Sequence, residues 1–358
     1  MEGTNNEFKM LDLMIRPAFC VADGVVIYAN HAAQQQLIRT STRITDLLVT
    51  GSDEYRSFSD GCLYLELSAG GSVCGASVTH MDSFDVFILE QEACDPQLQA
   101  LALAAKELRQ PLSSIMMVSS QLFPAISAEE DPVPRQQIAR INRGLFQLLR
   151  VVSNMSDASL YSSSAANHQE ITNVSALMEE IFQTASGHLE NAGIHLCFTN
   201  DCSGIFSHAD AVRLERAVNN LISNAAKFTP KGGRIQAKLF HRDKKLYLTV
   251  QDTGTGVAPD LRGNIYSRYH RQPGVEDSRF GIGLGMVLVR AVAAQHGGTV
   301  LVEYPEEGGT RVTMTLQIRQ EKSASLCSPI RMPDYLAGWD HALVEMSDLL
   351  PYTLYEKD

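Results

Sequence analysis

The chain has 358 residues, enough for two or three domains. With 44% hydrophobic and 20% charged residues, its composition is that of a globular protein and excludes a disordered one. The formal net charge of −11 argues against a broad basic surface, so nucleic acid is not an expected partner.

The start of the chain and its cysteines predict where the protein works. The polar stretch "MEGTNNEFKM" lacks the apolar core of a signal peptide, and no apolar run approaches the roughly 18–20 residues that a membrane helix needs. The seven cysteines are odd in number and include no CxxC pair, which favours reduced thiols over a disulfide framework or a zinc site. We therefore expect a cytoplasmic chain without a membrane span.

Residues 1–92 are predicted to form a small antiparallel sheet. Short apolar runs such as "AFCVADGVVIYAN" and "DSFDVFILEQ" alternate with turn signals, among them Asp23-Gly24 and the "GGS" at 70–72. One or two helices are expected after Asn30.

Residues 93–162 are predicted to form a helical hairpin. Apolar residues recur there at alternating steps of three and four, which is the spacing of a heptad seam, and "DPVPRQQ" interrupts the pattern. A lone hairpin cannot cover both seams, so a homodimer through residues 96–160, closing a four-helix bundle, is expected. Packing of the seams against other parts of the same chain is the alternative. The seam residues are Leu98, Leu101, Ala105, Leu108, Leu112, Ile115, Ser119 and Leu122, then Ile138, Ile141, Leu145, Leu148, Val152 and Met155.

Residues 163–320 follow a Ser/Ala-rich linker and mix helical with strand patterns, which predicts an α+β layer with one helical face. The tail, residues 321–358, contains a pattern typical of an amphipathic helix. Its apolar residues are Trp339, Ala342, Leu343, Met346 and Leu349.

A first candidate binding motif lies in "NNLISNAAKF". Asn220 and Asn224 are four residues apart, so they share one face of a helix. Amide oxygens there can ligate Mg²⁺ without adding charge, and Lys227, on nearly the same face, could contact a phosphate. Polar residues on a solvated helix face would give the same pattern, so the motif alone does not establish a site.

Two glycine-containing motifs follow. Asp252 ends a strand and begins "DTGTG", where its carboxylate can accept a hydrogen bond from the exocyclic amine of adenine, while Gly254 and Gly256 let the backbone approach a ligand closely. "GIGLGM" precedes an apolar helix, and backbone N–H groups at such a position bind anions. Its glycines are Gly281, Gly283 and Gly285.

The order of these motifs resembles the ATP-binding domain of sensor histidine kinases, a GHKL (Bergerat) α/β sandwich shared with gyrase-type ATPases and Hsp90. The resemblance implies that ATP and Mg²⁺ are the cofactors, that Asn224 binds Mg²⁺, and that Asp252 and Thr310 hold adenine. It also implies that residues 257–280, with "NIYSRYHR", form a mobile lid. Whether Arg268 and Arg271 of the lid contact phosphate is left open.

The resemblance extends upstream. "AKELRQPLSSI" resembles the phosphoacceptor motif of a HisKA-type dimerisation hairpin, and residues 13–90 more loosely resemble a PAS sensor, whose ligand is unknown. The fold class is accordingly multidomain α+β, with a small PAS-like α/β sensor, an antiparallel hairpin forming a dimeric four-helix bundle, and the GHKL sandwich. The expected domains are 1–92, 93–162, 163–320 and the tail 321–358.

The hairpin motif departs from the family at Lys106, where the phosphoacceptor histidine belongs. A neutral imidazole attacks phosphorus through a lone pair, and a lysine ammonium at neutral pH has none. No histidine lies between His80 and His168 to replace it. Autophosphorylation at this site is therefore expected to be lost.

Several functions remain compatible with the sequence. One is a degenerate, ATP-binding kinase homologue in two-component signal transduction, acting on a separate response regulator or an active partner kinase. Another, which the resemblance implies, is a response-regulator phosphatase using Glu107 and Gln110, where the amide of Gln110, three residues after the acid, orients a water. A third is an active kinase with an unrecognised acceptor. A gyrase-like or Hsp90-like ATPase is disfavoured, because Asn220 stands where those enzymes have a general-base Glu and Glu215 lies off that face.

Overall fold

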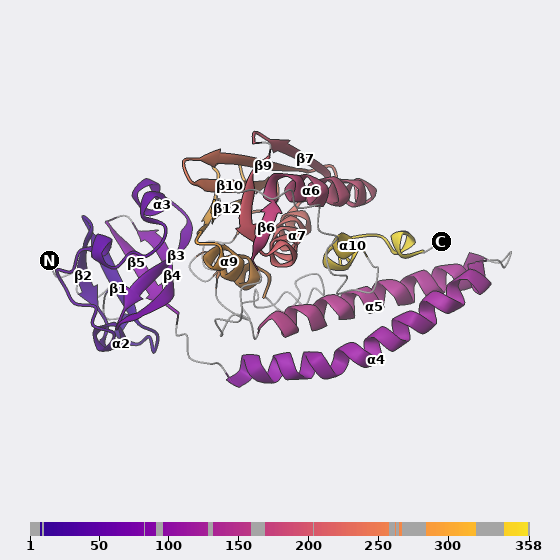
Figure 1. The fold of residues 1–358 in the computed structure, drawn as a ribbon, viewed down its shortest axis with the longest axis horizontal. Helices are drawn as coiled ribbons and strands as arrows, with labels where there is room; N and C mark the ends of the chain where they lie inside the picture. Colours follow the sequence, from indigo (N-terminus) through magenta and orange to yellow (C-terminus); the bar gives the residue numbers. More distant parts are fainter. Residues whose placement is uncertain are drawn as a thin grey trace.

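A computed structural model of the chain describes residues 8, 11–81, 83–90, 96–127, 132–158, 169–202, 204–257, 262, 265–266, 284–319 and 340–356. It comprises an N-terminal sheet unit, a long helical hairpin and a C-terminal α/β unit (Figure 1). Among the described residues, no helix combines the length and the apolar character needed to cross a bilayer.

The N-terminal unit is an antiparallel sheet in which the strands lie in the order β2-β1-β5-β4-β3. Two of its three hairpins turn where the sequence predicts, at Asp23-Gly24 and at Gly70-Gly71, and two short helices follow Asn30 as expected. Phe19 and Phe87 stack in its core with ring centroids 4.7 Å apart. The elements are β1 (Ala18–Ala22), β2 (Val25–Ala29), α2 (His31–Gln35), α3 (Ser52–Ser57), β3 (Cys62–Ala69), β4 (Ser72–Met81) and β5 (Phe84–Leu89).

The hairpin consists of α4 (Pro96–Ser127) and α5 (Pro132–Ala158). Each helix buries one of its two apolar heptad positions and exposes the other. In α4, Ala105 and Leu112 are buried whereas Leu108 and Ile115 are 49% and 53% exposed. In α5 the same division recurs: Ile138, Leu145 and Val152 are buried, and Ile141 and Leu148 are exposed. The helices therefore pack on each other through one stripe and leave a second apolar stripe uncovered.

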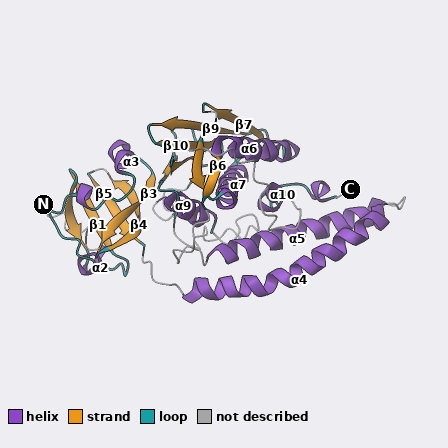
Figure 2. Cartoon of the chain, in the orientation of Figure 1, coloured by secondary structure: helices purple, strands orange, loops and turns teal. Residues whose placement is uncertain are grey.

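The C-terminal α/β unit has the predicted layer of helices against a sheet (Figure 2). Its strands lie in the order β11-β12-β10-β9-β7, and β6 pairs with β8 separately. The strands are β6 (Glu170–Asn173), β7 (His195–Asn200), β8 (Phe206–Ala209), β9 (Arg234–Arg242), β10 (Lys245–Asp252), β11 (Val300–Glu303) and β12 (Arg311–Gln317). The helices are α6 (Val174–Asn191), α7 (Ala211–Phe228) and α9 (Gly285–Gln295).

The two sheets join edge to edge into one sheet of ten strands. β3 of the N-terminal unit pairs antiparallel with β11, with Leu63 opposite Leu301. Beside this seam, the ammonium of Lys245 lies 2.8 Å from both carboxylate oxygens of Glu54. Main-chain hydrogen bonds and a partly buried ion pair thus connect the N-terminal unit directly to the C-terminal α/β unit.

The helix in the tail is shorter than the sequence predicts. Helix α10 spans only His341–Glu345, and Trp339 lies outside the described residues. Asp340 caps its first turn by accepting from the N–H groups of Ala342 and Leu343, at 2.8 and 3.3 Å. Beyond Glu345 the chain continues in turns to a 3₁₀ helix, η4 (Tyr352–Tyr355), which packs against α5, whereas α10 contacts both α5 and α7 (Figure 1). The polar pair at 347–348 follows the helix because Ser and Asp are poor helix formers.

Candidate functional site

Asp252 lies at the end of β10 with its carboxylate held by backbone N–H groups. Its Oδ1 accepts from the amide of Gly254 at 2.8 Å and from that of Thr310 at 3.3 Å. Asp252 is only 5% exposed, and this burial raises the pKa of the carboxyl, while the backbone hydrogen bonds oppose the rise. Because both bonds end on Oδ1, the second oxygen remains available to accept from a ligand.

Glycines surround Asp252 because side chains have no room there. A Cβ at Gly309 would overlap the carbonyl oxygen of Asp252, and a Cβ at Gly254 would overlap that of Phe228, the last residue of α7. Gly309 also has a φ of +80°, which L side chains rarely adopt. The "DTGTG" loop is therefore packed directly against the end of α7 and the turn before β12.

Asn220 and Asn224 lie on α7 beside the start of α9. The Nδ2 of Asn220 donates to the carbonyl of Arg216 at 2.9 Å, which turns its Oδ1 toward Gly285. A Cβ at Gly285 would come within 2.9 Å of that oxygen and 3.5 Å of the Nδ2 of Asn224. One helix, α7, thus connects the glycine at the start of α9 with the loop around Asp252.

The N-terminus of α9 begins at Gly285 with Leu284 as its N-cap. The Leu284 side chain cannot accept a hydrogen bond, so the first N–H groups of this helix have no cap from that residue. Such groups, together with the helix dipole, favour an anion. Gly281 and Gly283, the other glycines of this motif, lie outside the described residues.

The side chain of Lys227 lies close to Asp348 of the C-terminal tail. Its side chain is 10% exposed, and its ammonium lies 3.9 Å from the Oδ2 of Asp348. The pKa of Lys227 is lowered to about 8, because burial and then the positive charge of Arg150 lower it more than Asp348 and Glu345 raise it. The sequence predicted a phosphate contact for Lys227 but gave no sign of this acidic neighbour.

Most of the expected lid, residues 257–280, lies outside the described residues, including Arg268 and Arg271. Tyr266 is an exception and is fully buried. Its hydroxyl lies 2.8 Å from the carbonyl oxygen of Val300 and 3.0 Å from that of Cys62. A tyrosine of the "NIYSRYHR" stretch therefore sits at the seam between β11 and β3, a position that the sequence did not indicate.

Lys106, Glu107 and Gln110 form a different kind of surface. All three side chains are exposed on α4, next to the buried Ala105 that packs toward α5. Their exposure contrasts with Asp252 and Asn220, which are 5% and 6% exposed.

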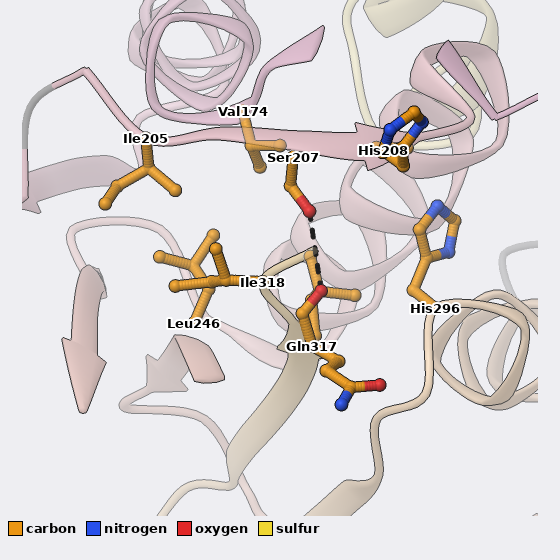
Figure 3. Close-up of a pocket in the computed structure, with 10 residues that line it drawn as sticks. Val174, Ile205, Ser207, His208, Leu246, His296, Gln317 and Ile318 are labelled. Atoms are coloured by element: carbon orange, nitrogen blue, oxygen red, sulfur yellow. Dashed lines mark hydrogen bonds between the residues drawn. The ribbon is translucent and has the colours of Figure 1, made fainter. Parts of the chain in front are cut away.

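A small cavity lies elsewhere in the α/β unit, between β8 and the ends of β10 and β12 (Figure 3). Its volume is about 10 Å³, room for at most one water. At its edge, His296 accepts from the N–H of Asp210 at 3.1 Å, and its Nδ1 is 2.7 Å from the carbonyl of Val292, to which it must donate. His296 is therefore a neutral, structural histidine, and its burial lowers its pKa. None of the predicted site residues lines this cavity.

The sequence of this chain is similar to those of known proteins. Residues 209–320 match the family described as histidine kinase-, DNA gyrase B- and HSP90-like ATPase. Histidine kinase P4 of Formosa agariphila is 25% identical over 70% of this chain and 19% of its own length. Sensor histidine kinase RppB of Synechocystis sp. is 30% identical over 62% of this chain and 49% of its own length.

Among solved structures, full-length ShkA in complex with AMPPNP is similar in fold, with a TM-score of 0.50 and 23% identity, over 65% of this chain and 47% of that one. The chain spans less than half the length of each of these relatives. The chain is therefore similar to histidine kinases, and its residues 209–320 match the ATPase domain of the histidine kinase, DNA gyrase B and HSP90 type.

Proposed function

We propose that this protein binds Mg-ATP in its ATPase domain and signals through the nucleotide state of that domain rather than through a phosphate on residue 106. One observation carries the proposal: a single helix, α7, contacts both candidate parts of the nucleotide site. Its end packs against the loop in which the N–H groups of Gly254 and Thr310 fix the Asp252 carboxylate, and its Asn220 lies against Gly285 at the start of α9. ShkA, which shares the fold, carries AMPPNP, an analogue of ATP.

The residues present fit the nucleotide. Oδ2 of Asp252 suits the exocyclic amine of adenine, and the N-terminus of α9, which the Leu284 side chain does not cap, suits a phosphate. Asn224 is half-buried beside Gly285 and would hold Mg²⁺ through its amide oxygen, with Asn220 alongside. The bound metal would neutralise phosphate charge there.

The exposed position of Lys106 supports a protein without autokinase activity. Lys106 offers no imidazole to accept the phosphoryl group, and its side chain projects into solvent from α4. The second candidate function, a response-regulator phosphatase, is supported by the exposure of Glu107 and Gln110, three residues apart on α4. Either function requires a separate response regulator or a partner kinase.

The uncovered stripes of the hairpin support a homodimer through residues 96–160. Two apolar stripes on neighbouring helices, Leu108, Ile115 and Leu122 on α4 and Ile141 and Leu148 on α5, are each about half exposed. A second copy would cover them in a four-helix bundle. The strand order of the N-terminal unit and its helices after Asn30 support a PAS-like sensor.

Calorimetric titration with Mg-ATP tests the nucleotide proposal. Asp252→Asn should weaken binding by about 1–3 kcal/mol, because the amide presents a donor where the adenine amine needs an acceptor. Asp201→Asn is a matched control, since Asp201 forms only a surface ion pair with Lys238, at 2.7 Å. Equal affinity of wild type and Asp252→Asn would reject the assignment of Asp252.

A further inference from the structure

The described tail, Asp340–Glu356, packs against three helices of two different units. We call this segment the C-terminal clasp. Its backbone carbonyls at Ser347 and Asp348 accept from the guanidinium of Arg143 on α5, at 3.0 and 2.9 Å. The carbonyl of Glu345 accepts from the hydroxyl of Ser223 on α7 at 2.9 Å. The clasp therefore bridges the hairpin and the ATPase domain.

Both ends of the clasp are fixed as well. At its start, Asp340 lies 2.6 Å from His188 of α6, and this partner lowers the pKa of Asp340 against the effect of burial. At its end, Tyr355 packs edge-on against Phe146 of α5, with ring centroids 5.0 Å apart. The segment between these contacts is held along its whole length.

The centre of the clasp brings two carboxylates to three buried cations. Asp348 pairs with Arg150 of α5 and lies 3.9 Å from Lys227 of α7. Glu345 lies 3.7 Å from Arg216, one helical turn before Asn220. Each of these five side chains is at most 10% exposed, so solvent screens their charges weakly.

Lys227 connects this cluster to the nucleotide residues. It follows Asn224 by three positions on α7, so the two lie on adjoining parts of one face. A phosphate that approaches the Asn pair needs a cation, and α7 offers Lys227 one turn after Asn224, just as Arg216 lies one turn before Asn220. A carboxylate and a phosphate cannot both lie beside the Lys227 ammonium without a large cost in free energy, because like charges in contact repel strongly where water is excluded.

We propose that the C-terminal clasp is an internal competitor of the nucleotide, in which the Asp348 carboxylate takes the place of a phosphate at Lys227 and holds the ATPase domain on α5. Binding of ATP then withdraws Lys227 from Asp348 and loosens the clasp, so that occupancy of the nucleotide site is transmitted to the hairpin. The inference rests on the proposed ATP binding and names the element that this binding moves.

The competition is specific for phosphate, and this makes it testable with ligands of different charge. Asp348→Asn keeps the shape of the side chain and removes its charge. It should tighten ATP binding by about tenfold and leave adenosine binding unchanged, since adenosine has no phosphate to compete. Glu356→Gln is the matched control: Glu356 also belongs to the clasp, but it pairs with Arg135 of α5, at 2.9 Å, rather than with Lys227.

Hydrogen exchange of the wild-type chain provides a second measurement that needs no variant. The amides of Val344, Met346 and Leu350 are bonded within the clasp, so their exchange reports its opening. ATP should speed their exchange several-fold and adenosine should not. A merely structural tail would give equal exchange with both ligands and a lower stability of Asp348→Asn with no change in ATP affinity, and that result would overturn the proposal.

The two proposals fail in different ways. If wild type and Asp348→Asn bind ATP equally well, ATP binding stands and the clasp is not a competitor. If neither chain binds ATP, both proposals are wrong.

Discussion

The surroundings of Asp252 and the surface around Lys106 differ in how the chain builds them. Asp252 is buried, bonded to backbone N–H groups and packed among glycines, so many residues fix one carboxylate. Lys106 is exposed on α4, and in the part of the chain that the structure describes no hydrogen bond or ion pair fixes its side chain. Binding of a nucleotide thus depends on the fold itself, whereas acceptance of a phosphate depends on one surface side chain. The residue at position 106 can change without destabilising the fold, whereas a change in the loops around Asp252 would destabilise it.

The largest effect is expected at the glycines around Asp252. Gly309→Ala places a methyl group against the backbone of Asp252 at a φ of +80° and should destabilise the chain by roughly 3–4 kcal/mol, with loss of ATP binding. Thermal unfolding and calorimetry measure both effects.

The neighbouring glycine is a close control. Gly308 also has a positive φ, +93°, but a Cβ there would meet nothing within 4 Å, so Gly308→Ala should cost only about 1 kcal/mol and keep ATP binding. Equal effects of the two substitutions would show that close packing around Asp252 is not what maintains the site.

The hairpin gives a smaller effect that concerns assembly. Ile115→Lys should weaken the proposed dimer by about 100-fold, because it puts a charge into an apolar stripe that is 53% exposed in one chain. Leu112 is unsuitable for this test, since it is buried within the hairpin and its substitution would unfold the monomer.

Light scattering over a range of concentrations measures the dimer. Val73→Lys, at an apolar position of β4 that is 44% exposed, is the control and should leave the oligomeric state unchanged. A wild-type chain that is monomeric at micromolar concentration would contradict the proposed dimer.

A still smaller effect concerns pH. The pKa of Lys227 is lowered to about 8 by burial, and a phosphate favours the ammonium form. The contribution of Lys227 to ATP affinity is therefore complete below pH 8 and falls as pH rises through 8, by at most about tenfold per unit. Lys227→Met should bind ATP more weakly below pH 8 and lose this dependence, which calorimetry at several pH values can measure.

The lowered pKa of Lys227 also predicts how the free energy of unfolding changes with pH. The unfolded chain, with the ordinary lysine pKa of 10.5, holds the proton more tightly than the folded chain. The unfavourable contribution of Lys227 to folding is therefore present below pH 8 and disappears as pH rises to 10.5. A slope of the opposite sign for the difference between wild type and Lys227→Met would contradict a buried ammonium.

Periodicity and turn residues were sufficient to predict the hairpin and the strands, because those patterns follow from local geometry. The heptad spacing could not tell which stripe packs internally, since Leu108 and Leu112 are equally apolar in sequence. The edge pairing of β3 with β11 and the contact of Asp348 with Lys227 join residues far apart in the chain. A single acidic residue in the tail belongs to no repeating pattern, so the sequence could not predict that Asp348 contacts Lys227. Only the structure shows the clasp.

Labelling with radioactive ATP and Mg²⁺ tests the central claim most directly. Wild type, Lys106→His and Lys106→His combined with Asp252→Asn are compared for acid-labile and acid-stable phosphate, with mass spectrometry to locate it. We expect no phosphate on wild type, and none on the double variant because its nucleotide site is weakened. Stoichiometric phosphate on Lys106 of the wild-type chain would show an active kinase and contradict the proposal that its output is conformational.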